Sequence, residues 1–127
     1  MSGGDPRYSA VVTALCADPQ GAGRPSGAGW CEGEAQDPLS GTHVRIFVKS
    51  VDRRVGEARF EVRGCPHTMA ALVWLMPVLQ GQPVDSLAVD FAELTEALGV
   101  PAEKRGRLLL IDDALKRAKF TVLSSLS

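Results

Sequence analysis

The sequence predicts an α+β fold in which helices cover a small antiparallel β-sheet. Two alternating apolar segments, 43–48 and 55–62, are separated by a short polar turn and form a hairpin. One helical apolar pattern precedes this hairpin and three follow it, and a sheet that buries one face needs such a cover. Since 127 residues is the usual size of one domain, we expect residues 1–127 to form one folded unit.

The N-terminal part predicts a short helix followed by a loop. Asp5-Pro6 has the residue types of an N-cap and a first helical position, and the apolar residues that follow at helical spacing are Tyr8, Val11, Val12 and Leu15. Cys16 falls on the last turn and is interpreted as a small packed residue. Residues 18–29 contain six Gly or Pro residues without periodicity, which predicts a flexible loop leading to Trp30-Cys31.

The hairpin is predicted from alternation. In the strand His43–Val48 the apolar face holds Val44, Ile46 and Val48, and in the strand Val55–Val62 it holds Ala58, Phe60 and Val62. Asp52-Arg53-Arg54 is expected to make the turn.

The next helix is expected to start after Cys65, with Met69, Leu72, Val73 and Met76 on its buried face. Pro77 should kink or end it near Met76, because proline lacks the backbone N–H that the helix needs. Gly81 is a suitable stop.

Two further helices complete the chain. Asp90 is expected to cap the first of them, which buries Phe91, Leu94, Thr95 and Leu98 and ends at Gly99. The last helix should run from Pro101 to about Phe120, with Leu108, Ile111, Leu115 and Ala118 buried, and residues 122–127 are expected to be a frayed tail.

Composition excludes several classes of function. The chain has 14 basic and 15 acidic residues without a basic stripe, so no nucleic-acid surface is expected. No apolar run reaches the roughly 18 residues of a membrane span, and the N-terminus lacks a signal-peptide pattern, which predicts a cytoplasmic protein. Its three cysteines, an odd number, favour free thiols or ligands over a disulfide framework.

The segment Gly64-Cys65-Pro66-His67 places a thiol where a strand ends and a helix begins. Unpaired N–H groups and the helix dipole lower a thiol pKa at this position, and the thiolate binds metals or attacks sulfur. His67 could be a second ligand or a proton acceptor. The alternative is that Cys65 is only a small helix-start residue. No paired carboxylates, Ser–His–Asp set or phosphate-binding Gly loop is visible, so we do not expect an enzyme.

Two longer segments resemble the iron–sulfur cluster scaffold family of IscU and the N-terminal domain of NifU. One runs from Glu57-Ala58-Arg59-Phe60 through Gly64-Cys65 to Ala70-Ala71, and the other is Asp112–Ala118. The resemblance covers roughly residues 7 to 120. It implies a [2Fe–2S] cluster built on three cysteines and one Asp or His. It also implies that a cysteine desulfurase supplies the sulfur and that acceptor proteins receive the cluster.

The resemblance carries over position by position. Cys65 matches the middle family cysteine, and Ser40-Gly41-Thr42 matches the family's Cys-Gly-Asp. Cys31 lies nine residues before Ser40 and could serve as a ligand only if the intervening segment loops out. Gly106-Arg107 stands where the family has His-Cys. Val100–Lys104 matches the family's Leu-Pro-Pro-Val-Lys chaperone motif only in part, so chaperone recognition is not expected.

These replacements leave three arrangements open, because a cluster normally needs four ligands. A cluster could bridge two protomers of a homodimer through Cys65, alone or with His67. Arg107 could stabilise the thiolate or a persulfide on Cys65. Arg107 could also be only an exposed residue of the last helix.

Several functions are therefore weighed. The first is a divergent assembly scaffold that binds iron, a [2Fe–2S] cluster or persulfide sulfur at Cys65, with Cys31 and His67 as secondary ligands. The second is a metal-free module that binds and regulates a cysteine desulfurase or another assembly factor. A third is zinc binding by Cys65, His67, Cys31 and His43, although their spacing matches no standard zinc motif. Thiol catalysis ranks last, because a Cys-x-x-Cys motif is missing.

Overall fold

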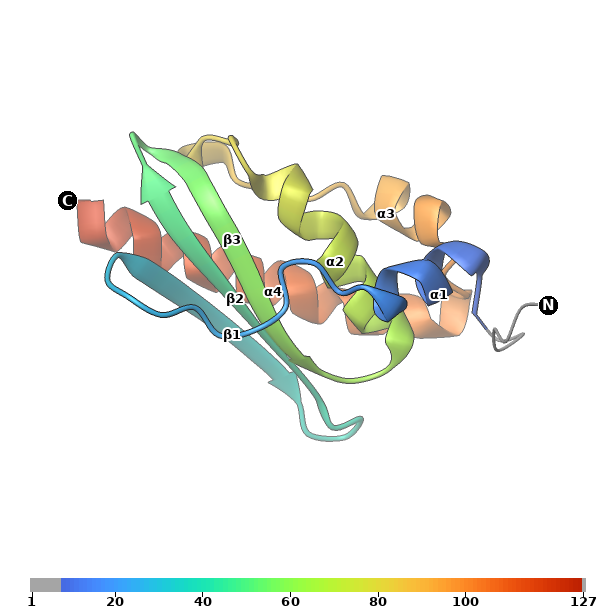
Figure 1. The fold of residues 1–127 in the computed structure, drawn as a ribbon. Coiled ribbons are helices and arrows are strands. Elements are labelled where there is room, and N and C mark those ends of the chain that lie inside the picture. Colours follow the sequence, from blue (N-terminus) through green and yellow to red (C-terminus); the bar gives the residue numbers. More distant parts are fainter. Residues whose placement is uncertain (1–7, 127) are drawn as a thin grey trace.

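The computed structural model describes residues 8–126 and confirms an α+β architecture. In chain order the elements are α1 (Ala10–Ala17), β1 (Trp30–Asp37), β2 (Thr42–Val51), β3 (Arg54–Arg63), α2 (Pro66–Leu79), the 3₁₀ helix η1 (Val84–Ser86), α3 (Phe91–Leu98) and α4 (Ala102–Leu126). The three strands form an antiparallel sheet in the order β1-β2-β3, and helices cover one of its faces (Figure 1).

The predicted two-stranded hairpin is thus a three-stranded sheet, because Trp30–Asp37 is also a strand. It pairs with β2 along its whole length, from Trp30 opposite Lys49 to Asp37 opposite Thr42. Packing against α4 explains this strand. A side-chain carbon on Gly33 would lie 2.0 Å from the Ala114 carbonyl oxygen, so only glycine allows the helix to approach so closely.

The turn between β2 and β3 is tighter than predicted. Val51 pairs with Arg54, so the loop has two residues, Asp52 and Arg53, with φ angles of 53° and 62°. Two consecutive left-handed residues match the right-handed twist of a hairpin. The Arg53 guanidinium also pairs with Asp85 at 3.2 Å, and its carbonyl accepts from Val84 N–H, which ties the turn to η1.

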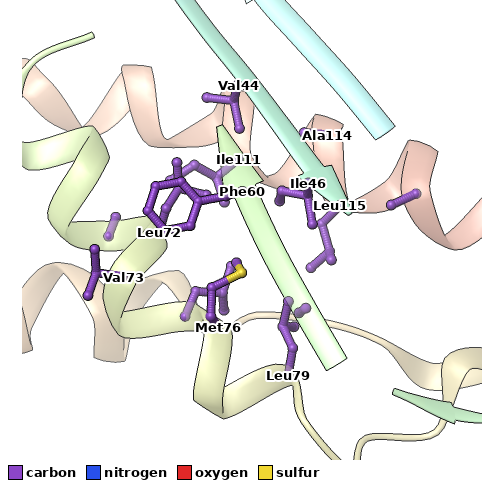
Figure 2. Close-up of a cluster of buried hydrophobic side chains, with 14 of the residues drawn as sticks. Val44, Ile46, Phe60, Leu72, Val73, Met76, Leu79, Ile111, Ala114 and Leu115 are labelled. Carbon is purple, nitrogen blue, oxygen red and sulfur yellow. The ribbon is translucent and has the colours of Figure 1, made fainter. Parts of the chain in front are cut away.

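The core lies between the sheet and the helices α2 and α4. Figure 2 shows Phe60 from β3 beside Leu72 of α2 and Ile111 of α4, and each of these side chains is at most 1% exposed. The predicted apolar face of the hairpin is confirmed, with Val44 and Ile46 fully buried. Burying one large apolar side chain contributes roughly 1.5–3 kcal/mol, so this interface stabilises most of the fold.

Helix α1 begins later than expected, at Ala10. The Ser9 hydroxyl caps it, accepting from Val12 N–H at 3.2 Å and donating to the Leu98 carbonyl at 2.8 Å. The predicted start at Asp5-Pro6 lies outside the described residues. Val12 is buried, but Val11 is 45% exposed and does not belong to the inner face.

The ends of two other helices also differ from the predictions. Helix α2 continues past Pro77 to Leu79, because a proline in the last turn removes few helical bonds. Helix α4 continues past Phe120 to Leu126, so residues 122–126 are helical instead of frayed, and Val122 is fully buried. Ser127 lies outside the described residues. The predicted caps of α3 are confirmed: Asp90 accepts from Glu93 N–H, and Gly99 has a φ of 64°.

The Gly/Pro-rich segment 18–29 is irregular as predicted, but part of it is fixed to the sheet. Gly23 N–H donates to the Phe60 carbonyl at 2.8 Å, and Phe60 N–H donates to the Gly21 carbonyl at 2.9 Å. Arg59 adds bonds to the carbonyls of Ala22 and Gly23. This part of the segment therefore covers the outer edge of β3. Within residues 8–126, no helix is long and apolar enough to cross a membrane.

Candidate functional site at the start of α2

Cys65 is the N-cap of α2, directly after β3 ends at Arg63. Its backbone is extended, with φ −78° and ψ 164°, and Pro66 occupies the first helical turn. The half-buried sulfur lies 3.6 Å from the Thr68 hydroxyl. The sulfur makes no cap hydrogen bond to a backbone N–H, but it lies at a helix start, where backbone N–H groups lack intrahelical partners.

Hydrogen bonds lower the pKa of the Cys65 thiol. Burial alone acts to raise this pKa. The backbone and hydroxyl of Thr68, the backbone of His67 and the Arg107 guanidinium outweigh burial because these donor groups stabilise the charged form of the sulfur. The helix start and one cation from α4 therefore favour the thiolate.

Arg107 belongs to this site and is not an isolated surface residue. It lies in the second turn of α4 and is half-buried, and its guanidinium contributes to the lowered pKa of the Cys65 thiol. It also lines a hollow of about 410 Å³ together with Asp37, the last residue of β1, and Pro38. Arg107 is thus the residue that connects this hollow with the Cys65 site.

The segment Ser40-Gly41-Thr42 lies at the same end of the molecule. A side-chain carbon on Gly64 would be 3.3 Å from Thr42 Cγ2, which places Thr42 against the residue before Cys65. The Ser40 hydroxyl lies 2.9 Å from the Thr42 hydroxyl and 2.9 Å from an Asp37 carboxylate oxygen. The three segments singled out by the resemblance, at 40–42, 65 and 107, therefore meet.

Cys31 does not reach this place. It pairs with Val48, whereas Arg63, two residues before Cys65, pairs with His43. Five residues of β2 separate the two positions, about 17 Å at the rise of a strand. The Cys31 sulfur instead faces the Ser125 hydroxyl at 3.9 Å. Because residues 30–37 are fully paired with β2, the segment after Cys31 does not loop out as that hypothesis required.

His67 is buried, with only 2% of its surface exposed, and its ring lies 4.9 Å from that of Tyr8. Within the described part of the chain, neither ring nitrogen has a hydrogen-bond partner. Burial lowers the pKa of His67, and the charge of Lys104 lowers it further against the opposing effect of Glu103. The His67 imidazole is therefore buried and favoured in its neutral form.

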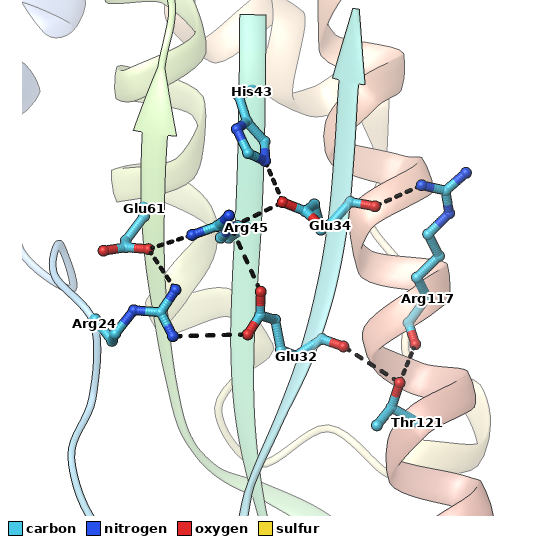
Figure 3. A network of polar contacts seen from close by, with 8 residues as sticks. All are labelled: Arg24, Glu32, Glu34, His43, Arg45, Glu61, Arg117 and Thr121. Atoms are coloured by element: carbon cyan, nitrogen blue, oxygen red, sulfur yellow. Dashed lines mark hydrogen bonds and ion pairs between the residues drawn. The ribbon is translucent and has the colours of Figure 1, made fainter.

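The proposed zinc ligands are not gathered. His43 lies on the other, polar face of the sheet, where its ring contacts Glu34 in a network of ion pairs (Figure 3). The other members of this network are Arg24, Glu32, Arg45 and Glu61. Across residues 8–126, no group of three or more His, Cys, Asp or Glu residues is placed to hold a metal ion.

Cys16 is a neighbour that the sequence did not reveal. Its sulfur donates a hydrogen bond to the Pro66 carbonyl at 3.4 Å, so α1 brings a second half-buried thiol to the first turn of α2. Burial raises the pKa of Cys16, the backbone of Ala70 opposes this, and the nearby Cys65 charge raises it further. No local sequence pattern could predict this contact between Cys16 and Pro66, because all three strands lie between them in the chain.

A larger hollow of about 630 Å³ lies elsewhere, between α1, α2 and β3. Its lining includes Leu15, Ala58 and Met76, but neither cysteine nor histidine. The chemistry that could bind metal or sulfur is at the start of α2, and we place the candidate site there.

Comparison with known sequences gives one family. The model of the NifU-like N-terminal domain matches residues 7–123. Two iron–sulfur cluster assembly scaffold proteins of Archaeoglobus fulgidus, IscU 1 and IscU 2, are each 28% identical to this chain over 88 residues. The match covers 68% of this chain and 58% of each relative, so the chain spans little more than half of their length.

Comparison with solved structures gives the same fold. A crystal structure from Fervidobacterium islandicum AW-1, described as a candidate iron–sulfur cluster assembly scaffold protein for the SUF system, matches with a TM-score of 0.72 at 14% identity, covering 89% of this chain and 96% of that one. The N-terminal part of a NifU-like protein from Brucella abortus matches with a TM-score of 0.56 at 16% identity, covering 91% and 83%.

Proposed function

This chain belongs to the NifU-like N-terminal domain family of iron–sulfur cluster assembly scaffolds, and we propose that it carries sulfur as a persulfide on Cys65. One observation supports this proposal above all. Cys65 lies at the N-cap of α2 with its sulfur 3.6 Å from the Thr68 hydroxyl, and Arg107 of α4 helps to lower the pKa of its thiol. A thiolate held in this way is the form of cysteine that attacks a sulfur atom.

The sulfur is cargo, and its transfer needs no oxidant. The Cys65 thiolate attacks the terminal sulfur of a persulfide on a cysteine desulfurase. The sulfur–sulfur bond of the donor breaks, its electron pair leaves with the desulfurase cysteine as a thiolate, and a new sulfur–sulfur bond forms on Cys65. Arg107 then pairs with the negative charge of the new persulfide. Turnover belongs to the desulfurase, so this chain acts as a carrier and not as an enzyme.

The site fits sulfur better than a complete cluster within one protomer. A [2Fe–2S] cluster takes four ligands, mostly thiolates that offset the iron charge. At the aligned positions this chain offers one thiolate, Cys65, while Ser40 and Thr42 carry hydroxyls and Arg107 carries a positive charge. Iron or a cluster at Cys65 would therefore take its other ligands from a second protomer or from a partner.

Two exposed leucines mark where a partner could dock. Leu39, in the turn after β1, is 98% exposed, and Leu109, on the hollow beside Arg107, is 59% exposed. A desulfurase that delivers sulfur to Cys65 would cover this end of the molecule, and apolar residues there gain from losing contact with water. We therefore propose a cysteine desulfurase as the sulfur donor and iron–sulfur assembly proteins as acceptors, in the cytoplasm, where thiols stay reduced.

The test is desulfurase-dependent sulfur loading. The reduced protein is incubated with a cysteine desulfurase and cysteine, trapped with an alkylating reagent, and weighed by mass spectrometry. We expect the unchanged protein and the control Cys31→Ser to gain sulfur and Cys65→Ser to gain none. Serine is a favourable N-cap, so Cys65→Ser should stay folded. Equal loading of Cys65→Ser would overturn the proposal.

The second candidate, a metal-free regulator of the desulfurase, is favoured by the hydroxyls and the arginine that replace the family ligands. Desulfurase turnover, measured with and without this chain, separates the two functions. If Cys65→Ser changes turnover as much as the unchanged protein does, regulation is the better description. If the effect disappears with Cys65, sulfur acceptance explains it.

A further inference from the structure

Two thiols lie at the first turn of α2. Cys65 starts this helix, and the Cys16 sulfur hydrogen-bonds to the carbonyl of Pro66, the next residue along the chain. Both thiols are free and half-buried, whereas the third, Cys31, lies at the other end of the sheet. Cys16 lies outside the aligned ligand positions, and the persulfide transfer proposed above does not use it.

The position of Cys16 is fixed by the packing of α1. Val12 is fully buried in the core, and the Ser9 hydroxyl links the start of α1 to the Leu98 carbonyl at the end of α3. Because α1 is fixed at its start and in its middle, its last turn, which carries Cys16, packs against α2 in one orientation. The packing of α1 therefore places the Cys16 sulfur beside the residue that follows Cys65.

We propose that Cys16 is a second sulfur-binding residue, which receives the terminal sulfur of a persulfide formed on Cys65. This inference rests on the function proposed above. The Cys16 thiolate attacks the terminal sulfur, and the sulfur–sulfur bond to Cys65 breaks with its electron pair left on Cys65. The proton lost by Cys16 balances the thiolate released at Cys65. No electrons are gained or lost, so no outside reagent is needed.

The surroundings of the two thiols favour transfer in this direction. The helix start and Arg107 stabilise Cys65 as a thiolate, and a stabilised thiolate is the better leaving group. The Cys16 sulfur bonds to the Pro66 carbonyl, and burial raises the pKa of its thiol, so its thiolate is the stronger nucleophile once formed. Moving the sulfur to Cys16 frees Cys65 for a second one, and a [2Fe–2S] cluster contains two sulfides.

The experiment follows one sulfur atom between two thiols. The variant Cys31→Ser keeps only Cys16 and Cys65, and it is treated with less than one equivalent of glutathione persulfide. Samples are alkylated at successive times, and the persulfide at each cysteine is measured by peptide mass spectrometry. We expect sulfur to appear first on Cys65 and then to rise on Cys16 as it falls on Cys65.

Two further variants make the result decisive. In Cys31→Ser/Cys65→Ser, Cys16 should lose most of its sulfur uptake, although a small alkylating reagent still reaches its thiol. In Cys31→Ser/Cys16→Ser, Cys65 should still load, and the sulfur held at saturating donor should fall by half. Thermal unfolding of each variant checks that the fold is kept.

The outcomes separate this inference from the function on which it rests. Loading of Cys65 without any sulfur on Cys16 would overturn the relay and leave the carrier function intact. Equal uptake by Cys16 with and without Cys65 would also overturn the relay, because Cys16 would then take sulfur directly. Absence of sulfur from Cys65 itself would overturn both.

Discussion

The interior beneath the sheet and the end that carries Cys65 differ in how closely their residues agree with the family pattern. In the interior, Phe60, Leu72 and Ile111 do what their periodicity predicts, and the fold is that of the family. At the Cys65 end, the family's positions also come together, but Thr42 and Arg107 bring a different chemistry. The packing that makes the fold is thus independent of the ligands, so the backbone of a scaffold can persist while its cargo site changes.

The largest effect on the interior is expected from Gly33→Val in β1. Any side chain at this position meets the α4 backbone, with 2.0 Å to the Ala114 carbonyl. Overpacking a core commonly costs about 1–3 kcal/mol, and a clash with backbone atoms costs more, so we expect a loss above about 3 kcal/mol. Chemical denaturation measures the free energy of unfolding.

The matched control for Gly33 is Gly106→Ala. Gly106 lies inside α4 with open space around its α-carbon. Replacing a helical glycine by alanine should stabilise the protein by about 0.5–1 kcal/mol. If Gly33→Val unfolded at the same denaturant concentration as the unchanged protein, the close contact between β1 and α4 would be disproved.

Arg107→Gln is expected to alter the Cys65 end and leave the interior unchanged. Without the guanidinium, one of the groups that lower the pKa of Cys65 is lost, so this pKa should rise. The rate of Cys65 alkylation against pH should shift its midpoint upward, with a few-fold slower reaction at neutral pH. Arg105→Gln is the control, because Arg105 bonds to the Val100 carbonyl instead. If both variants gave the same dependence of the Cys65 alkylation rate on pH, Arg107 would have no specific effect on the Cys65 thiol.

Leu39→Ser tests the docking surface at the same end. Leu39 is almost fully exposed, so its loss should leave the free energy of unfolding unchanged to within about 0.5 kcal/mol. Sulfur loading by the desulfurase should slow a few-fold, while loading from glutathione persulfide stays the same. Val51→Ser, at the other end of β2 and 54% exposed, is the control. Slowing by both variants alike would argue against docking at Leu39.

The smallest expected effect is that of His67 on the pH dependence of stability. This buried residue lies between the interior and the Cys65 end. Its pKa is lowered in the fold, so the unfolded chain binds a proton that the folded one resists. Stability is therefore fully present above the ordinary histidine pKa of about 6.5 and falls as the pH drops toward the lowered value. The variant His67→Gln should flatten this slope between pH 7 and 5 in denaturation curves. An unchanged slope would show that His67 does not cause it.

Much of the interior could be predicted from the sequence, because periodicity reports burial directly. The exceptions have physical reasons. The strand 30–37 was missed because its charged residues and Gly33 give little β propensity, and its stability comes from contact with α4. The helical end of α4 was missed because the serines after Leu123 have low helix propensity, although Val122 fixes this end by being fully buried.

The candidate site could be predicted only where local chain geometry determines it. Cys65 was found because a strand end followed by a proline and a helix is visible in the sequence, and Arg107 was found through its aligned position. The position of Cys16 was not found, because it depends on how α1 packs against α2. Cys31 was misplaced for the converse reason, since the pairing of its strand was unknown.

The segment 21–23 has a consequence for how molecules of this protein behave toward each other. An uncovered outer strand offers its backbone to the same strand of another copy, which is how ordered aggregates begin. Gly21 and Gly23 occupy the backbone groups of Phe60, the most deeply buried residue of that strand. An irregular stretch of chain thereby protects the sheet from growing by addition of further copies, and insertions would be tolerated after Gly23 but not within the paired residues.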